Sequence, residues 1–194
     1  MKRVRACLLA LAGLMLAATA GSQAVLDTLF DKLRTATDPV AVQAVEQGIW
    51  EQWVMVPDPA HRQLMMRGIA EMQQQELQSA VATFTKLIQS APELSEAWNK
   101  RATVWWLLGN FDASIADICE TVKREPRHFG AYSGLGMIRA QMGEHARAAA
   151  AFELAKKWNP HIVGIDAEID RQKAEAGGRV ADDPLGCGQR TAGR

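Results

Sequence analysis

Residues of the same kind recur every 34 positions along this chain, and this period constrains the fold more than any other feature. Four columns repeat with that spacing, and each keeps its chemical character. They are Pro92, Pro126 and Pro160; Gly68, Ala102 and Gly136; Ala80, Ser114 and Ala148; and Phe84, Ile118 and Phe152. No insertion or deletion interrupts the register. The sequence therefore predicts an array of equal structural units, each packed on its neighbours.

Each column has a physical explanation if the unit is a pair of packed helices. Small side chains in the first helix let the second helix approach, and small side chains in the second helix admit the next unit. The Phe/Ile column is expected to fill the space between neighbouring pairs. Each proline ends a second helix, because it lacks an N–H and disfavours helical backbone just before it. Gly109-Asn110 and Gly143-Glu144 predict the tight turns inside two units.

These residues resemble the tetratricopeptide repeat family, whose unit is a helix–turn–helix of 34 residues. The repeats are expected at 61–94, 95–128 and 129–162, inside a repeat region over 59–162. The third resembles the family best, through Tyr132, Leu135, Gly136, Ala148, Phe152, Ala155 and Pro160. The second keeps Trp98, Ala102, Trp105 and Pro126. The resemblance implies an all-α fold, a right-handed superhelical solenoid of three repeats.

Three positions depart from the family pattern. Arg101 stands where the second repeat would usually carry Leu. In the first repeat, Arg67 and Glu71 replace a Leu and an aromatic residue. The first repeat is therefore the weakest match of the three.

Amphipathic helices are expected on both sides of the repeats. Two apolar stripes precede them, Leu26, Leu29, Phe30 and Leu33, then Val42, Val45, Ile49 and Trp53. Asp38-Pro39 predicts the N-cap and first residue of the second of these helices. Because the pair is out of register with the 34-residue columns, a capping helical hairpin is expected over 21–58. Ile162, Ile165 and Ile169 predict a C-terminal capping helix over 163–176. The Gly-rich segment 177–194 is expected to be disordered.

Residues 1–20 have the three parts of a secretory signal peptide. Lys2, Arg3 and Arg5 precede an apolar run from Cys7 to Ala20, and small residues offer cleavage near Ala20 or Ala24. An uncleaved membrane anchor is the alternative. About 14 apolar residues rise only about 21 Å as a helix, less than the roughly 30 Å hydrocarbon core. The sequence therefore predicts export across the inner membrane into the periplasm.

Charge and cysteine content exclude several classes of protein. The chain has 22 basic and 22 acidic residues, and loss of residues 1–20 leaves 19 minus 22, a net charge of −3. A nucleic-acid-binding protein needs a basic surplus, so nucleic acid is not an expected partner. Three cysteines are too few for a disulfide scaffold or a four-ligand zinc site. An oxidising compartment permits a Cys119–Cys187 bridge, but a fixed bridge to the Gly-rich tail is not expected.

No motif for catalysis or for binding a cofactor occurs in the sequence. The four histidines, His61, His128, His145 and His161, fall at repeat junctions or helix starts. Stacked repeats are about 10 Å apart, whereas zinc needs ligands within about 2.1 Å of one point. The histidines are therefore expected at the surface or in turns. The charged runs 123–125 and 144–147 are expected to be solvated. No catalytic residue, metal ion or small-molecule cofactor is predicted.

The family resemblance implies that the first helices line a concave groove for extended or helical peptide segments. When the family's groove positions are transferred to this sequence, they fall on three rows that each step by 34 residues. The rows are Met65, Asn99 and Ser133; Ile69, Thr103 and Met137; and Met72, Trp106 and Ala140. Trp106 lies about 100° round the helix from Trp105, so it should face the groove if Trp105 packs inside. The rows are rich in Met, which suits irregular apolar partners. Met65 and Ile69 occupy positions where carboxylate-clamping family members carry Lys and Asn, so a chaperone-tail-binding role is unsupported.

Two functions remain open from the sequence, with a third ranked well below them. The first is a non-catalytic interaction module of the bacterial cell envelope, an adaptor or assembly factor that binds a protein or peptide partner. The second is a self-associating structural protein whose groove is occupied by its own N-terminal hairpin. An enzyme is the third, because no pocket with convergent polar groups can be identified in the sequence.

Overall fold

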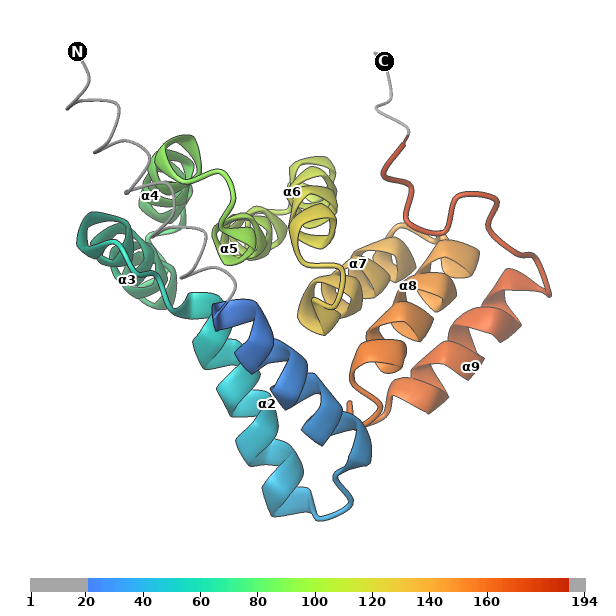
Figure 1. Cartoon of the computed structure of the whole chain (residues 1–194). Helices are drawn as coiled ribbons and strands as arrows, with labels where there is room; N and C mark the ends of the chain where they lie inside the picture. The colour runs from blue at the N-terminus through green and yellow to red at the C-terminus, as the bar shows by residue number, and fades with distance from the viewer. Residues whose placement is uncertain (1–20, 189–194) are drawn as a thin grey trace, which may run out of the picture. The chain divides into compact units, whose positions relative to one another are not determined.

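The computed structural model describes residues 21–188, which form two compact units divided between Trp53 and Val54 (Figure 1). The predicted signal peptide, residues 1–20, lies outside the described residues, as do residues 189–194. No helix in the described part is both long enough and apolar enough to cross a membrane.

The N-terminal unit contains the two helices that the apolar stripes predict. Residues 21–35 are helical, and α2 spans Pro39–Val54. Asp38 caps α2, because its Oδ2 accepts a hydrogen bond from the Ala41 N–H at 2.8 Å. Leu33 and Ile49 are fully buried, and the rings of Phe30 and Trp53 are 6.1 Å apart between centroids. The predicted stripes therefore form the core of this unit.

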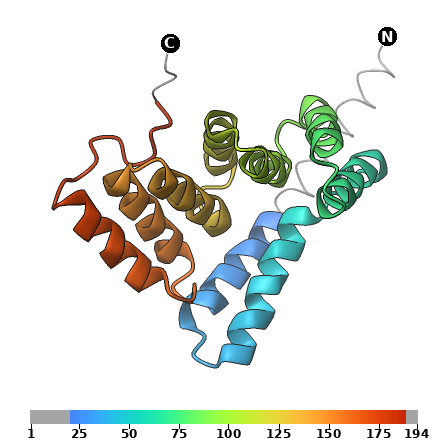
Figure 2. The ribbon, with the colours of Figure 1, turned by 180° about the vertical axis from the view of Figure 1, so that it is seen from behind.

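The second unit consists of three helix pairs and a single final helix, arranged side by side in chain order (Figures 1 and 2). The pairs are α3 (Pro59–Gln73) with α4 (Leu77–Ser90), α5 (Ser95–Leu107) with α6 (Phe111–Arg124), and α7 (Phe129–Gln141) with α8 (His145–Trp158). The last helix, α9 (Ile165–Ala176), packs on α8. Each second helix also contacts the next first helix. The predicted all-α solenoid with a C-terminal capping helix is confirmed for the described residues.

Glycine and phenylalanine are matched inside the first and third helix pairs. A Cβ atom placed on Gly68 would lie 2.7 Å from the Phe84 ring, and one on Gly136 would lie 2.7 Å from the Phe152 ring. The second pair has Ala102 and Ile118 in the same columns. The phenylalanine rings thus press against the first helix of their own pair, whereas the sequence predicted them between neighbouring pairs.

We expect Gly136→Ala to lower the free energy of unfolding by about 1–3 kcal/mol, because the added methyl group overpacks the contact with Phe152. Adding Phe152→Ile reproduces the Ala–Ile combination of the second pair and should recover part of this loss. Urea unfolding of wild type, both single variants and the double variant measures the coupling between the two positions. Strictly additive effects would contradict the matching of ring and glycine.

The turn inside each repeat uses left-handed backbone at one fixed column. Gly109 and Gly143 both have φ of 73° there, as the sequence predicts. The first repeat carries Gln75 at this position with φ of 62°, although left-handed backbone is unfavourable for a side chain with a Cβ. The turn is therefore kept in the first repeat even though its glycine is not.

Arg101, at a position where the family usually has Leu, connects three helices. Its Nε and Nη2 atoms donate to the two carboxylate oxygens of Asp117 on α6, both at 2.7 Å. Its Nη1 donates to Thr85 Oγ1 on α4 at 2.9 Å. Burial raises the pKa of Asp117, although the guanidinium opposes this. A partly buried ion pair therefore replaces the apolar contact expected at this junction.

The expectation of a solvated charged run is wrong for Glu125. Its side chain is buried and accepts from Arg127 Nε at 2.9 Å. The neighbouring Arg124 guanidinium lies 4.6 Å from the centre of the Trp98 ring, and its Nε donates to the Pro92 carbonyl. The run thus joins the end of α6 to the turn after α4.

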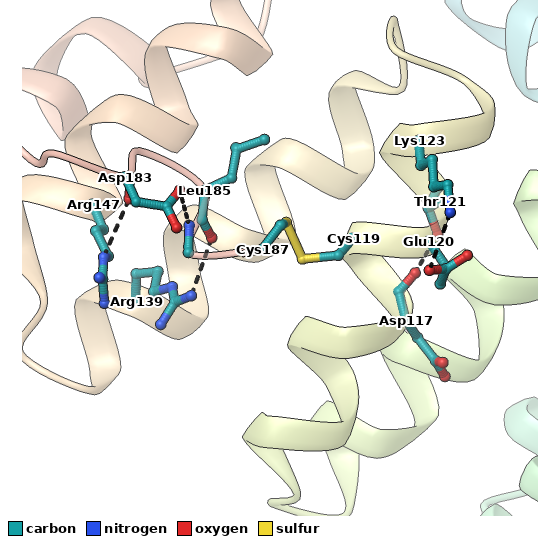
Figure 3. Close-up of a disulfide and its surroundings, with 11 residues drawn as sticks. Asp117, Cys119, Glu120, Thr121, Lys123, Arg139, Arg147, Asp183, Leu185 and Cys187 are labelled. Carbon is teal, nitrogen blue, oxygen red and sulfur yellow. Dashed lines mark hydrogen bonds and ion pairs between the residues drawn. A yellow bond between two sulfur atoms is a disulfide. The ribbon is translucent and has the colours of Figure 1, made fainter. Parts of the chain in front are cut away.

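The C-terminal segment corrects two predictions. Cys119 on α6 forms a disulfide with Cys187, so the expectation that no fixed bridge forms is wrong (Figure 3). Arg139 Nη2 donates to the Leu185 carbonyl at 3.1 Å, and Arg147 Nε donates to the Asp183 carbonyl at 3.3 Å. Residues 177–188 are therefore held against the repeats, and the prediction of disorder is wrong for them. The segment is held through its main-chain carbonyls, which every residue type has. Its order therefore leaves no periodic apolar pattern in the sequence.

Candidate functional site

A pocket of about 230 Å³ opens beside the first helices of the second and third repeats. It includes five of the nine residues predicted for the groove, namely Asn99, Thr103, Trp106, Ser133 and Met137. The other lining residues are Ala102, Ser114, Ile118, Gly130, Ala131, Gly134 and Ile138. Met137 is 46% exposed, and Trp106 is half-buried, with one side against the core. Trp106 thus lines this pocket, and its role as a partner-binding groove residue stays a prediction.

The remaining four predicted groove residues lie elsewhere. Met65 is completely buried in the core formed with Phe84 and Leu87. Ile69 and Met72 are half-buried against the same core, and Ala140 packs against the core of the later repeats. The first repeat therefore contributes core side chains at the columns where the second and third repeats contribute the pocket.

Several polar groups of the pocket are already engaged within the chain. Thr103 Oγ1 donates to the Asn99 carbonyl at 3.0 Å, and Ser114 Oγ donates to the Ala102 carbonyl at 2.8 Å. The Trp106 Nε1–H donates to Gln141 Oε1 at 3.3 Å. Asn99 Nδ2 donates to Glu96 Oε2 at 3.0 Å. The indole hydrogen bond holds the Trp106 ring toward α7.

A buried polar cluster adjoins the pocket through Asn99. His128 lies in the turn between α6 and α7, as expected for a turn histidine, but it is completely buried, so the alternative of a surface position is wrong for this residue. It caps α7, because its Nδ1 accepts from the Ala131 N–H at 3.1 Å. Since Nδ1 is an acceptor, the proton is on Nε2, which lies 2.9 Å from Glu96 Oε2 and donates to it. Lys100 Nζ lies 2.9 Å from Glu96 Oε1.

The environment of Glu96 stabilises its charged form. Burial alone would raise the pKa, but the hydrogen bond from His128 and the charge of Lys100 hold the pKa below its ordinary value of 4.5. Glu96 is therefore an ionised carboxylate next to the pocket-lining Asn99. Its hydrogen-bond and ion-pair partners come from α5 and from the start of α7. No sequence signal marked His128 for this place.

Acid should weaken the fold through Glu96. Because its pKa is lower in the folded chain than in the unfolded chain, its contribution is present above about pH 4.5 and is lost as the pH falls below that value. We expect Glu96→Gln to show a smaller loss of stability between pH 6 and pH 3 than wild type, although it is less stable at pH 6. Urea unfolding across this range measures both, and parallel pH profiles would contradict the assignment.

A second pocket, between α8 and α9, is lined mainly by charged side chains, four of which form two ion pairs. It has a volume of about 370 Å³ and is lined by Glu153, Lys156, Lys157, Asp166, Ile169, Asp170 and Lys173. Lys156 pairs with Asp166, and Lys173 Nζ lies 2.7 Å from Glu153 Oε1. Nowhere in residues 21–188 do three His, Cys, Asp or Glu side chains form a group that could hold a metal ion.

The repeat region matches a known protein family. The sequence model of the family described as Tetratricopeptide repeat matches residues 65–121 and 108–161, which together cover half of the chain. The chain belongs to the tetratricopeptide repeat family. It is 30% identical over 128 residues to a tetratricopeptide repeat-containing protein of Rhizobium etli, a match that covers 66% of this chain and 63% of that protein. The chain thus spans less than two thirds of the relative's length.

Solved tetratricopeptide repeat structures share the fold. The first such domain of Spaghetti (RPAP3), bound to the HSP90 peptide SRMEEVD, superposes with a TM-score of 0.58 at 19% identity, over 60% of this chain and 93% of that chain. The MamA protein superposes with a TM-score of 0.58 at 19% identity, over 82% of this chain and 85% of that chain. At these identities the likeness extends to the fold alone.

Proposed function

We propose that this tetratricopeptide repeat protein is a non-catalytic interaction module of the bacterial cell envelope that binds a partner protein or peptide at its groove. The observation that carries the proposal is the pocket between α5 and α7, which opens at the columns where the family resemblance predicts the groove. Its walls are mostly apolar and carry no charged side chain, and Met137 and Trp106 present polarizable surface to solvent. The structurally similar domain of Spaghetti (RPAP3) is bound to an HSP90 peptide.

Capture of partners from the native cell tests the groove. Wild type and the Trp106→Ala/Met137→Ala variant are expressed with a small affinity tag, cross-linked in the cell and purified, and the attached proteins are identified by mass spectrometry. We expect at least one partner to be lost from the variant. The matched control is Leu107→Ala/Met142→Ala, because both residues are exposed apolar side chains outside the pocket. Equal recovery of every partner by all three proteins would count against groove binding.

An envelope location is part of the proposal. Residues 1–20 have the composition of a signal peptide. The Cys119–Cys187 disulfide is of the kind that persists in oxidising compartments. We expect the protein in the periplasmic fraction, with a mass that corresponds to cleavage near Ala20 or Ala24. Recovery of the uncleaved chain from the cytoplasm would contradict this location.

Self-association with a groove filled by the N-terminal hairpin is the competing function. Sedimentation of the purified protein over a hundredfold range of concentration separates the two. A monomer mass that stays constant over this range would exclude self-association. In a separate capture experiment, partners that bind only after deletion of residues 25–56 would favour a groove filled by the hairpin. Retained helical circular dichroism shows that the shortened chain is folded.

A further inference from the structure

The two junctions between repeats are held together by different bonds at the same column of the sequence. At the first junction, Arg101 Nη1 on α5 donates to Thr85 Oγ1 on α4 at 2.9 Å. One period later the same columns hold Leu135 on α7 and Cys119 on α6, and a leucine side chain cannot donate a hydrogen bond. Cys119 bonds to Cys187 instead. A covalent bond to the C-terminal segment therefore stands where the first junction has a hydrogen bond between repeats.

Residues 177–188, here called the strap, cross the second junction (Figure 3). The strap follows the end of α9. Arg147 on α8 donates to one of its main-chain carbonyls, and Arg139 on α7 donates to another. Cys187 then reaches α6 through the bridge. The strap therefore joins the third repeat and α9 to the second repeat.

The residues that hold the strap are sequence neighbours of residues that line the pocket. Ile118 on α6 lines the pocket, and the next residue, Cys119, forms the bridge. Ile138 on α7 also lines the pocket, and the next residue, Arg139, donates to the strap. Two glycines of α7 line the pocket as well and supply no side chain to fill the junction. The strap thus ties together the two helices that carry these pocket walls.

The bridge is the strongest attachment that the strap has among the described residues. Leu185 packs against the core of the later repeats but is only half-buried. The hydrogen bonds from the two arginines are 3.1 and 3.3 Å long, and Val180 is 89% exposed. Fixing the twelve residues 177–188 costs more conformational entropy than these contacts return. The bridge therefore keeps the strap in place.

The bridge is also open to attack by a thiol. Cys187 is exposed, whereas Cys119 is half-buried, and exposed disulfides are the ones that exchange readily. A thiolate of a dithiol attacks Cys187 Sγ, the bond between the two sulfurs breaks, and Cys119 leaves as a thiolate that takes up a proton. The second thiolate of the dithiol then attacks the mixed disulfide, and Cys187 leaves in the same way. The dithiol is oxidised to a disulfide, and two electrons pass to the protein.

We propose that the Cys119–Cys187 bridge is a redox-controlled latch on the second repeat junction. Reduction by a dithiol releases the strap, and the third repeat with α9 then moves relative to the first two repeats. Because the pocket is lined from both sides of this junction, its width changes with the redox state. The consequence for partner binding rests on the proposed function, whereas the release of the strap and the movement of the junction do not.

Modification of arginine by phenylglyoxal tests the release of the strap. Arg139 is 5% exposed, and a Cβ placed on Gly186 of the strap would lie 2.2 Å from Arg139 Nη2, so the strap covers this guanidinium. The full-length gene product, purified as the cell processes it, is compared before reduction and after reduction and removal of the dithiothreitol. We expect reduction to raise the modification rate of Arg139, measured by mass spectrometry, at least about tenfold.

Arg101 is the internal reference, because it is also partly buried and paired with a carboxylate but does not contact the strap. Its modification rate should not change on reduction, which shows that the repeats stay folded. Cys187→Ala should modify at Arg139 at the fast rate without any reductant. An Arg139 rate that is the same in oxidised wild type, reduced wild type and Cys187→Ala would overturn the latch.

Spin labels test the movement of the junction. They are carried by p-acetylphenylalanine, which leaves the native cysteines in place, at two exposed positions, Ser79 on α4 and Glu175 on α9. Double electron–electron resonance should give a broader distance distribution in Cys187→Ala than in oxidised wild type. The control pair, Ser79 and Asp112 on α6, lies within the first two repeats and should give the same distribution in both proteins. Equal distributions for Ser79 and Glu175 would contradict the proposal, because the strap would then tie nothing.

Partner capture separates failure of the latch from failure of the proposed function. A partner that is lost from Trp106→Ala/Met137→Ala should be recovered at least about threefold less from Cys187→Ala than from wild type, because a looser pocket must be ordered on binding. Equal recovery would contradict the coupling to the pocket and leave groove binding standing. If no partner is lost from Trp106→Ala/Met137→Ala, the proposed function fails, and the two measurements on the purified protein still decide the latch.

Discussion

Reduction of the Cys119–Cys187 disulfide should lower the free energy of unfolding by about 4 kcal/mol. The bridge joins residues 68 positions apart, and closing a loop of this length removes entropy from the unfolded chain. In the folded chain the neighbouring residues Leu185 and Asp183 are also hydrogen-bonded to Arg139 and Arg147. Chemical unfolding with and without dithiothreitol, followed by circular dichroism, measures the effect.

Cys187→Ala is the control for this measurement. It removes the bridge and leaves Cys119, whose side chain packs against the core of the later repeats, in place. The variant should unfold at the same denaturant concentration with or without reductant, close to the reduced wild type. Wild-type unfolding that does not respond to dithiothreitol would show that the bridge contributes nothing to stability.

Arg101→Leu should lower the free energy of unfolding by about 3 kcal/mol, even though it restores the residue that the family usually carries. The side chains of Arg101 and Asp117 are 16% and 6% exposed, so the substitution leaves the Asp117 carboxylate in the interior without its guanidinium. Adding Asp117→Leu removes the buried charge and should recover most of the loss, because an apolar pair tolerates the same site.

Arg67→Leu is the matched control, since Arg67 occupies the same column one period earlier. Its side chain is 67% exposed, although it also pairs with a carboxylate, that of Glu71 at 2.7 Å. The effect of Arg67→Leu should stay at about 1 kcal/mol, because the guanidinium that it removes lies in solvent, even though the Glu71 side chain is only 9% exposed. Equal losses at the two positions would contradict the role assigned to burial of the arginine, which urea unfolding of wild type and the three variants tests directly.

The sequence predicted those parts of the fold that depend on period and side-chain volume. Pro92, Pro126 and Pro160 lie just beyond the ends of second helices, and Gly109 and Gly143 adopt the left-handed turn. Gly68 and Gly136 admit a helix that carries Phe. These features depend on local backbone and steric fit, which repeat with the chain.

The remaining features depend on partners far apart in the sequence. Nothing near Cys187 indicates that Arg139 and Arg147 would hold its segment. His128 could be placed only after Glu96, 32 residues earlier, was known to be buried. The columns indicated Asn99, Trp106 and Met137, which line the pocket, and their role in partner binding stays a prediction. Gly130 and Gly134 also line the pocket but lie outside the predicted columns, so their part in it required the packed helices.

The disulfide makes the two ends of the repeat array unequal. Part of α6, together with α7, α8 and α9, lies inside one covalent ring, whereas α3, α4 and α5 lie outside it. In an array stabilised by nearest neighbours, fraying starts at a free end and spreads inward. The ring closes off one of those ends, so unfolding by heat or by mechanical force should begin at the first repeat. The pocket spans this boundary, with an anchored wall on α7 and a yielding wall on α5.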